Sequence, residues 1–221
     1  MKNLTRLYLF LIFVFLYAPI LVLIVLSFNE SRSRATWTGF TFHWYIQLFH
    51  DASIMEALTN TLTIAVISSL AATIIGTAAA IGIHSLNRRA RAVIMNITNL
   101  PVLNPDIVTG ISLMILFIFA FNILQVGRLG FTTILLSHIT FNIPYVILAI
   151  LPRLRQLDDN LYEAALDLGA KPSYAFLHVI LPEIMPSVIT GAVLAFTLSL
   201  DDFIVTFFTT DRKSTRLNSS H

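Results

Sequence analysis

Three carboxylates in this 221-residue chain lie inside or beside long apolar runs. They are Asp106, Asp201 and Asp202. A carboxylate at the middle of a bilayer costs roughly 2.5–3.5 kcal/mol even on the more lenient insertion scale, so it normally faces a bundle interior, a wet cavity or a cationic partner. We predict that these residues line or gate a translocation path. The alternative is that they pair with a second subunit or cap a helix break.

Helix geometry limits what these aspartates can do together. Adjacent residues on a helix point about 100° apart, so Asp201 and Asp202 cannot both point squarely into one pore. Pro101 and Pro105 release backbone carbonyls around Asp106, and a broken helix beside a cavity can use such groups. Weaker candidates are three asparagines, for which interhelical hydrogen bonds are the expected role: Asn104, Asn122 and Asn142.

No catalytic constellation is evident in the sequence. The phosphate-binding pattern G-x-x-x-x-G-K-[ST] is absent, because the segment from Gly169 to Ser173 has the wrong spacing and contains a proline. The six histidines form no H-E-x-x-H metal motif, and cysteine is absent. His138 lies within an apolar run, where an interhelical hydrogen bond is the expected role. We predict no enzyme, no metal site and no cofactor bound by this chain.

The elements that must position these residues are transmembrane helices. The chain is 56% apolar and 12% charged, against about 25% charged residues in an average soluble domain. A spanning helix needs about 20 mostly apolar residues, and five runs qualify. We predict an all-α, polytopic transmembrane helix bundle over residues 1–210. The expected spans cover residues 7–28, 58–83, 97–121, 129–152 and 184–208.

The basic residues divide unevenly between the two sides of this predicted bundle. Cytoplasmic loops carry an excess of Lys and Arg, and eight basic residues fall on one side against three on the other. The side with eight holds Lys2, Arg6, Arg88, Arg89, Arg91, Arg153, Arg155 and Lys171, and the other side holds Arg32, Arg34 and Arg128. The N-terminus is therefore expected in the cytoplasm. In the longest external loop, Trp37, Trp44 and Tyr45 are expected to anchor the chain at the membrane interface.

Residues 211–221 (DRKSTRLNSSH) are polar and follow an apolar span abruptly. After five crossings this segment lies outside, yet it carries Arg212, Lys213 and Arg216, which conflicts with the charge rule. We interpret it as a non-native tail, and we expect the natural chain to continue into a sixth span.

The cytoplasmic loop over residues 153–183 has the pattern of a folded element. Asn160 can cap a helix, with Glu163 in the capping-box position. Gly169 can end that helix in a left-handed conformation, and a second short helix is expected to stop at Pro182. The result is a helix–glycine–helix elbow. An elbow lying on the membrane and a docking element for a soluble partner both fit the pattern.

The same loop resembles the EAA motif of the permease subunits of ABC importers, the MetI-like family. The motif reads E-A-A, three residues, G, nine residues, I, one residue, L-P. Matching positions are Glu163, Ala164, Ala165, Gly169, Leu181 and Pro182, and Val179 stands in place of the isoleucine. The resemblance implies that the loop is a coupling helix, which sits in a cleft of a separate ATPase subunit and passes its movement to the membrane helices. It also implies that ATP and Mg are held by that subunit.

Further segments resemble the spermidine/putrescine branch of this family. They are LYAPILVLIVLSFN (16–29), PDIVTGISL (105–113), SHITF (137–141), EAALDLGA (163–170) and LAFTLSLDDF (194–203). The resemblance implies a polyamine permease of the bacterial inner membrane. It also implies three kinds of protein partner: ABC ATPase subunits, a second permease subunit and a periplasmic polyamine-binding protein. No nucleic acid is expected to bind.

Other function classes remain open at this point. A permease of the same family for another small organic solute fits the loop equally well. An ion-coupled secondary transporter would also place carboxylates at mid-membrane, but inverted repeats with paired broken helices are expected there and are not evident. A membrane-bound enzyme would need a catalytic cluster at one interface. Recovery of a nucleotide-binding subunit with the chain separates the ABC permease from the other two classes.

Overall fold

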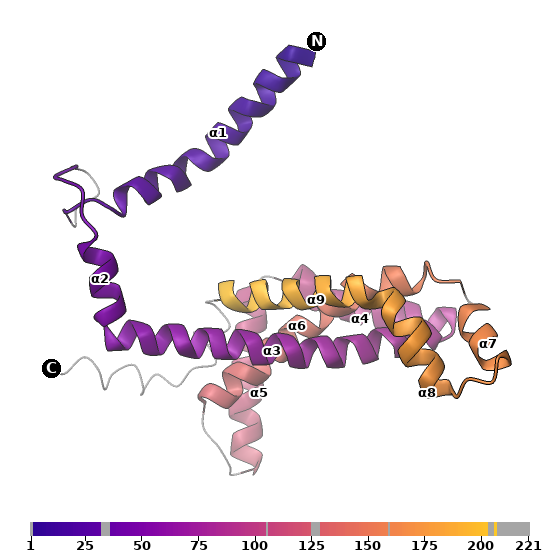
Figure 1. Cartoon of the computed structure of the whole chain (residues 1–221). Helices are drawn as coiled ribbons and strands as arrows, with labels where there is room; N and C mark the ends of the chain where they lie inside the picture. The colour runs from indigo at the N-terminus through magenta and orange to yellow at the C-terminus, as the bar shows by residue number, and fades with distance from the viewer. Residues whose placement is uncertain are drawn as a thin grey trace. The chain divides into compact units, whose positions relative to one another are not determined.

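The computed structural model describes residues 2–31, 36–104, 106–124, 129–158, 160–202 and 206. Within these ranges the regular structure is helical, apart from an isolated antiparallel bridge between Asn29 and Phe40. This confirms the prediction of an all-α fold. The chain divides into two compact units, residues 1–59 and residues 60–221, and helix α3 (Ala52–Ser85) begins in the first and continues through the second (Figure 1).

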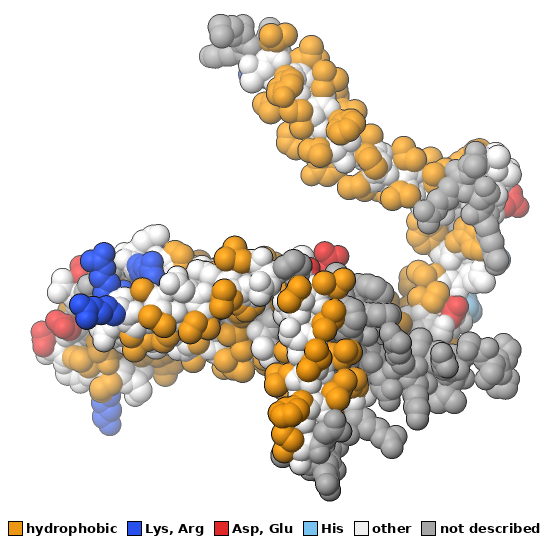
Figure 2. Space-filling view, turned by 180° about the vertical axis from the view of Figure 1, so that it is seen from behind, with side chains coloured by type: hydrophobic (Ala, Val, Ile, Leu, Met, Phe, Trp, Pro, Cys, Tyr) orange, Lys and Arg blue, Asp and Glu red, His pale blue; other side chains and the backbone are white. Residues whose placement is uncertain are grey.

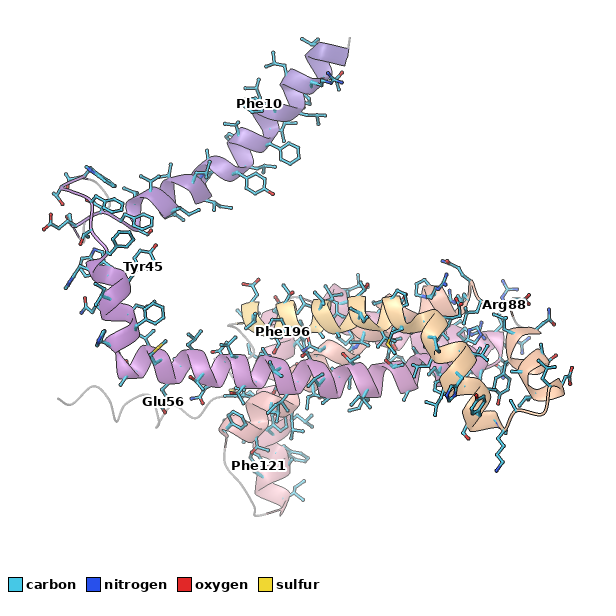
Figure 3. All side chains as sticks on the ribbon, in the orientation of Figure 1. Phe10, Tyr45, Glu56, Arg88, Phe121 and Phe196 are labelled. Atoms are coloured by element: carbon cyan, nitrogen blue, oxygen red, sulfur yellow. The ribbon has the colours of Figure 1, made fainter. Side chains whose placement is uncertain are left out.

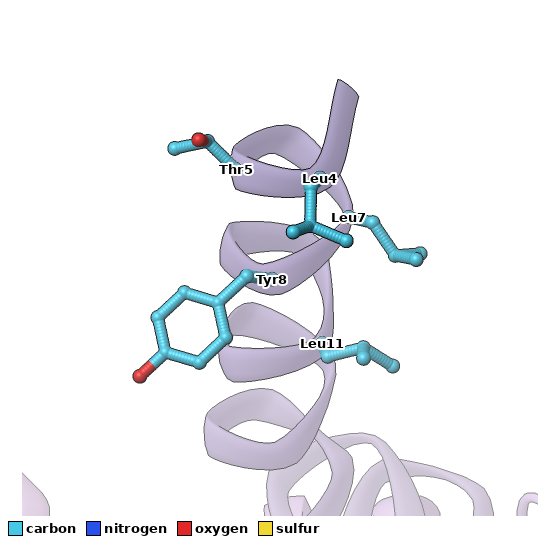
Figure 4. A pocket seen from close by; sticks show the side chains of 5 residues that line it. All are labelled: Leu4, Thr5, Leu7, Tyr8 and Leu11. Carbon is cyan, nitrogen blue, oxygen red and sulfur yellow. The ribbon is translucent and has the colours of Figure 1, made fainter. Parts of the chain in front are cut away.

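Helix α1 (Lys2–Leu26) corresponds to the first predicted span and ends two residues before it. It is long and apolar enough to cross a membrane, and its side chains are exposed within the first unit. Leu4, Leu7, Tyr8 and Leu11 project from successive turns around a shallow hollow of about 380 Å³ (Figure 4). A helix that is apolar all round needs lipid or another protein around it.

A folded turn joins α1 to the short helix α2 (His43–His50). Asn29 is only 2% exposed, and its side chain accepts a hydrogen bond from the backbone N–H of Thr38 at 2.9 Å. The indole N–H of Trp44 donates to the carbonyl of Asn29 at 2.8 Å. Phe28 forms ring contacts with three aromatic side chains: Phe40, Phe42 and Tyr45. Two of the predicted interfacial aromatics therefore hold this turn together: Trp44 through its hydrogen bond and Tyr45, labelled in Figure 3, through its ring contact.

Helix α3 has 34 residues, so at 1.5 Å per residue it is about 50 Å long and extends beyond the predicted span 58–83 at both ends. Asp51 caps its N-terminus by accepting hydrogen bonds from the backbone N–H groups of Ser53 at 3.0 Å and Ile54 at 3.3 Å. The Ser53 hydroxyl also donates to this carboxylate at 2.8 Å. These bonds, that of the hydroxyl first, hold the pKa of Asp51 below its usual value.

Arg91 of helix α4 (Arg88–Leu103) closes the other end of α3. Its guanidinium donates to the carbonyls of Ile83 at 3.2 Å and Leu86 at 3.0 Å, and also to that of His84. The last carbonyls of a helix have no partner within the helix, and a cation is favourable beside them. Arg91 therefore fixes the junction between α3 and α4.

The core of the second unit lies among α3, α6 (Phe131–Leu154) and α9 (Leu181–Asp201) (Figure 1). A Cβ atom added at Gly76 of α3 would lie 2.7 Å from Val146 Cγ1 of α6, so the two backbones approach closely. Small residues permit such approach between membrane helices. The buried cluster is aliphatic throughout: Ala72, Ala80, Ile83, Val146, Ile147, Ile150, Leu151, Leu154, Ile184 and Ala195.

The region predicted as a single span over 97–121 consists of two helices. Helices α4 and α5 (Asp106–Leu124) are bent by 106° at the break between them. Asn104 leaves the helical region, with φ −82° and ψ 143°, which is the conformation favoured before a proline. Among the described residues, four helices are long and apolar enough to cross a membrane individually, and the bent pair makes a fifth if it counts as one span.

Helix α9 ends at Asp201, inside the predicted span 184–208. Asp202 has ψ 80° and leaves the helix, while its N–H still bonds to the carbonyl of Leu198 at 3.0 Å. Carboxylates are unfavourable at the negative end of a helix dipole, which is consistent with an end at this pair. The predicted non-native tail, residues 211–221, lies outside the described residues.

Candidate functional site

The cytoplasmic loop folds into the predicted helix–glycine–helix elbow. Helix α7 (Asn160–Asp167) is followed two residues later by Gly169, whose φ of +86° is the left-handed conformation that favours glycine. The N–H of Gly169 donates to the carbonyl of Leu166 at 2.8 Å, and the N–H of Ala170 donates to that of Ala165 at 3.1 Å. These two bonds form the helix-ending arrangement known as the Schellman motif. Gly169 therefore sets the direction in which the chain leaves α7.

Asp158, and not Asn160, caps the start of α7. Asp158 Oδ1 accepts a hydrogen bond from the backbone N–H of Asn160 at 3.0 Å, and its carbonyl accepts one from Leu161 at 3.1 Å. The predicted capping box between Asn160 and Glu163 is therefore wrong, because Asn160 is already part of the helix. Glu163 is exposed in the first turn, where the helix dipole favours a carboxylate.

The second half of the elbow runs directly into α9. Helix α8 (Pro172–Ala175) continues as a π-helical turn, η1 (Phe176–Ile180), and α9 begins at Leu181. The predicted stop at Pro182 is therefore wrong. Pro182 has no N–H to donate, but proline is tolerated in the first turn of a helix. Turns of π-helix often occur at functional sites.

The motif residues divide into two groups by exposure. Four motif residues are exposed: Glu163, Ala164, Gly169 and Pro182. The other three are half-buried: Ala165, Val179 and Leu181. Apolar side chains beside them are also open, with exposed fractions of 90% for Leu168, 57% for Tyr174 and 52% for Leu177. A cluster of exposed apolar side chains on a polar loop typically marks a protein interaction site.

A cavity of about 480 Å³ lies between this elbow and the ends of α3 and α6. Its apolar walls include Ile81, Leu154 and Ile180, and its polar lining includes His84, Asp158 and Tyr162. The elbow is therefore incompletely packed against the helices that it adjoins. Within the described residues, no group of three or more His, Asp or Glu side chains here or elsewhere is arranged to hold a metal ion.

Basic side chains of the second unit gather at the end that carries the elbow (Figure 2). The guanidinium of Arg153 ties α6 to α9 there, with Nη2 3.0 Å from Glu183 Oε2 and Nε donating to the Glu183 carbonyl at 3.1 Å. The described basic residues of this unit are those that the charge rule assigns to the cytoplasmic side: Arg88, Arg89, Arg91, Arg153, Arg155 and Lys171.

The three aspartates occupy helix ends. Asp106 is the first residue of α5, at the positive end of its dipole, and Asp201 is exposed at the last residue of α9. Asp202 is half-buried. The carboxylates of Asp106 and Asp202 both act electrostatically on the hydroxyl of Tyr145 in α6. Two of the three predicted carboxylates therefore lie within electrostatic range of one tyrosine, which was not among the predicted site residues.

A buried polar network joins three helices beside this region. Ser68 Oγ lies 3.0 Å from Ser199 Oγ, and His138 Nδ1 lies 2.7 Å from the same Ser199 Oγ. His138 Nε2 lies 3.0 Å from Thr206 Oγ1, which donates to the carbonyl of Asp202 at 2.9 Å. Because the Thr206 hydroxyl donates to that carbonyl, Nε2 of His138 carries the proton and Nδ1 accepts from Ser199. The interhelical role predicted for His138 is confirmed.

Comparison with known proteins identifies the family. Residues 72–215 match the family model described as "Binding-protein-dependent transport system inner membrane component". The chain belongs to this family. The matched segment contains the whole elbow, and so the motif positions from Glu163 to Pro182 lie within it.

Individual relatives extend the match over most of the chain. The spermidine/putrescine transport system permease protein PotC of Escherichia coli (strain K12) is 40% identical over 182 residues, which are 82% of this chain and 67% of the relative. The putrescine transport system permease protein PotI of the same strain is 42% identical over 191 residues, 86% of this chain and 68% of the relative. PotC of Haemophilus influenzae is 37% identical over 181 residues, 81% and 68% of the two chains.

These matches confirm the family resemblance of the EAA-motif loop. The chain is a membrane-spanning permease component of a transport system, and it is not an enzyme. Together with its apolar helices, family membership makes it a multi-pass protein of the inner membrane.

Proposed function

We propose that this permease moves polyamines, spermidine or putrescine, across the bacterial inner membrane in an ATP-driven importer. The observation that carries the proposal is the identity of 40% and 42% with two permeases whose names specify these substrates, over more than four-fifths of the chain. At neutral pH a polyamine is a flexible cation, and a carboxylate inside a membrane protein normally faces such a partner or a wet cavity.

The carboxylates beside Tyr145 support a path for a cation. Asp106 and Asp202 come from different helices and act on the same hydroxyl. In this proposal they form the charged part of the path, because an ammonium group can move from one carboxylate to the other when both lie near the same tyrosine. Asp201 lies next to them in sequence at the end of α9 and serves as a third, more exposed carboxylate.

The elbow is the proposed docking site for an ABC ATPase subunit. Its support is the combination of matched motif positions with the exposed side chains of Leu168, Tyr174 and Leu177. An elbow with an apolar, solvent-facing surface fits a groove on a soluble protein. The docking residues are Glu163, Ala164, Ala165, Gly169, Val179, Leu181 and Pro182. ATP and Mg are held by that partner, and this chain binds no cofactor.

Two further partners complete the proposed importer. A second permease subunit covers apolar faces such as that of α5, where Ile115 is 58% exposed and Phe119 is 63% exposed. A periplasmic polyamine-binding protein delivers the substrate on the opposite side from the elbow. The proposed N-terminus is cytoplasmic, since Lys2 and Arg6 precede the first span.

The test is uptake by the assembled importer. The chain is co-expressed with the products of its neighbouring genes, purified as a complex and reconstituted into proteoliposomes with the binding protein. We expect saturable uptake of labelled spermidine or putrescine that requires ATP. Asp202→Asn should slow this uptake about tenfold, since a hydrogen bond to a charged group contributes on the order of 1.5 kcal/mol or more. The neighbouring Asp201→Asn should slow it less.

Three results would contradict parts of the proposal, and they are distinguishable. ATP-driven uptake of another solute without polyamine uptake would refute the substrate and retain the permease. Uptake driven by an ion gradient without ATP would indicate a secondary transporter. Equal effects of the two aspartate variants would refute the assignment of Asp202 to the path.

A further inference from the structure

Asn142, in the middle of α6, is fully buried and carries an unsatisfied amide. Its exposed fraction is 0%, and among the described residues neither Nδ2 nor Oδ1 has a hydrogen-bond partner. A buried polar group without a partner is destabilising by roughly 1–3 kcal/mol. Such groups are uncommon in folded proteins, and each one needs an explanation. The interhelical hydrogen bond predicted for Asn142 is not present among the described residues.

The other buried polar side chains of α6 have partners. Ser137 donates to the carbonyl of Thr133 at 2.7 Å, and Thr133 donates to that of Gly130 at 2.7 Å. His138 uses both ring nitrogens, one with Ser199 and one with Thr206. Within the described part of α6, Asn142 is therefore the buried polar side chain with capacity left for a ligand.

Asn142 lies on the same face of α6 as Tyr145. Residues three and four apart on a helix are neighbours, so His138, Asn142 and Tyr145 form one polar stripe along α6. The stripe is anchored at His138, whose network reaches the carbonyl of Asp202 through Thr206. At its other end lies Tyr145, whose hydroxyl is close enough to the carboxylates of Asp106 and Asp202 to be affected by their charge. Asn142 therefore lies along α6 between the hydrogen-bonded His138 and Tyr145, the residue affected by the two carboxylates.

We propose that Asn142 and Tyr145 form, with Asp106 and Asp202, a binding site for an alkylammonium group. An ammonium has three N–H donors and no acceptor, so it needs several oxygen atoms at once. Asn142 Oδ1 and the Tyr145 hydroxyl supply neutral acceptors, and the carboxylates supply charge. The face of an aromatic ring also attracts a cation. The inference rests on the proposed function, because it names where the chain holds the amine that it transports.

The proposed site gives a role to the unsatisfied amide of Asn142. Because the side chain is enclosed by its own helices, a second subunit cannot reach it without a rearrangement. An ammonium group likewise requires the helices around Asn142 to separate, and the proposal places its binding in such a state of the transport cycle. In the arrangement described here the amide is desolvated, and binding of an ammonium group relieves that penalty. Asn142 therefore favours the substrate-bound state of the path over the empty one.

The test uses Asn142→Leu in the assembled, reconstituted importer. Leucine has a similar volume and removes both unsatisfied atoms, so the thermal stability of the complex should stay the same or rise. Polyamine uptake per ATP hydrolysed should fall at least about tenfold, the effect of losing one hydrogen bond to a charged group. ATP hydrolysis stimulated by the loaded binding protein should persist, since the elbow is untouched. Asn142→Ala, measured in parallel, should lose uptake as well.

Thr140→Val is the matched control on the same helix. Thr140 is exposed and its hydroxyl bonds only to the carbonyl of its own helix, Leu136, at 2.8 Å, so uptake should be unchanged. Unchanged uptake per ATP in Asn142→Leu would overturn the site. A loss of thermal stability that accompanies the loss of uptake would also overturn it, because that is the signature of a structural hydrogen bond. Absence of polyamine uptake by the wild type would instead refute the proposed function.

Discussion

Gly169 is the residue at which the elbow depends on backbone conformation alone. Its φ is +86°, and a Cβ atom added there would meet no atom within 4 Å. A substitution therefore changes the backbone preference without creating a clash. For a residue with a side chain, the left-handed conformation costs about 1–2 kcal/mol. The two hydrogen bonds that end α7 require that conformation.

We expect Gly169→Ala to loosen the end of α7 by about 1 kcal/mol. Hydrogen–deuterium exchange of the amides of Gly169 and Ala170 should become several-fold faster, and less ATPase subunit should co-purify. Gly82→Ala is the matched control, because Gly82 lies in open space within α3 at an ordinary helical φ. Its effect on both measurements should be small. Equal exchange in the two variants would show that the elbow does not need the left-handed residue.

At the residue scale, the sequence predicted what depends on a few neighbouring positions. The glycine at the end of α7 follows from local helix-ending rules, and it lies where the spacing of the motif puts it. The cap was assigned to Asn160 in place of Asp158 because both residue types are good caps and they lie two positions apart. The neighbourhood of Tyr145 was missed, since it depends on how three helices meet. The one available signal was the spacing of His138, Asn142 and Tyr145.

Among the elements, α3 and α6 meet through a glycine. Gly76 is buried, and a Cβ atom there would lie 2.7 Å from Val146 Cγ1 and 2.8 Å from its Cβ. Neither of these atoms can move far without moving the backbone of α6. Gly191 of α9 is buried against the same valine, but an added Cβ would lie 3.5 Å away, an ordinary contact distance.

We expect Gly76→Ala to lower the stability of the second unit by about 1–3 kcal/mol, the usual cost of overpacking a core. The measurement is thermal unfolding of the detergent-solubilised protein. Its readout is the fraction of protein that remains monodisperse after heating. Gly191→Ala should be neutral or slightly stabilising, since its methyl group fits. A larger loss from Gly191→Ala than from Gly76→Ala would contradict the helix packing described here.

Helix positions followed from hydropathy, and helix ends did not. Apolar runs located α1, α3, α6 and α9, since lipid requires about 20 apolar residues whatever the tertiary structure. The break before Asp106 had a visible cause in the prolines around it. No sequence signal indicated that the helix would continue through Pro182. A proline can end a helix or lie in the first turn of one, and the conformation of the preceding turn decides between the two. Here a π-helical turn precedes it, which is a property of the folded chain.

For the molecule as a whole, the distribution of charge sets the orientation in the membrane. The described basic residues of the second unit belong to the start of α4, the end of α6 and the elbow. Basic segments of this kind stay on the cytoplasmic side. The chain contains no cysteine, so a single introduced cysteine is the sole target for a thiol reagent.

We expect Lys171→Cys to react with a membrane-impermeant maleimide only after the cells are opened. Gln47→Cys, in the exposed part of α2, should react in intact cells. Both side chains are exposed, so the two variants differ in the side of the membrane and not in access within the protein. The reverse pattern would place the N-terminus and the elbow outside and would refute ATPase docking at this loop.

At the same scale, the class of the molecule could be predicted and its internal arrangement could not. Composition and run length were sufficient for an all-α membrane protein, and one motif at fixed spacing was sufficient for the family. The position of the carboxylates within a path required the packing of α5, α6 and α9. Packing of that kind depends on pairs such as Gly76 and Val146, which lie seventy positions apart in the sequence.

Helices α8, η1 and α9 follow one another without a break, so the elbow is joined directly to the membrane helix α9. The π-helical turn lies between the elbow and α9. Helix α9 has 21 residues and is about 30 Å long. A tilt of α9 by about 5° at the π-helical turn displaces the opposite end of α9 by roughly 3 Å. That displacement is about one hydrogen-bond length, and the far end carries Asp201 and Asp202. A small push on the elbow is therefore large enough to make or break a contact at the carboxylates.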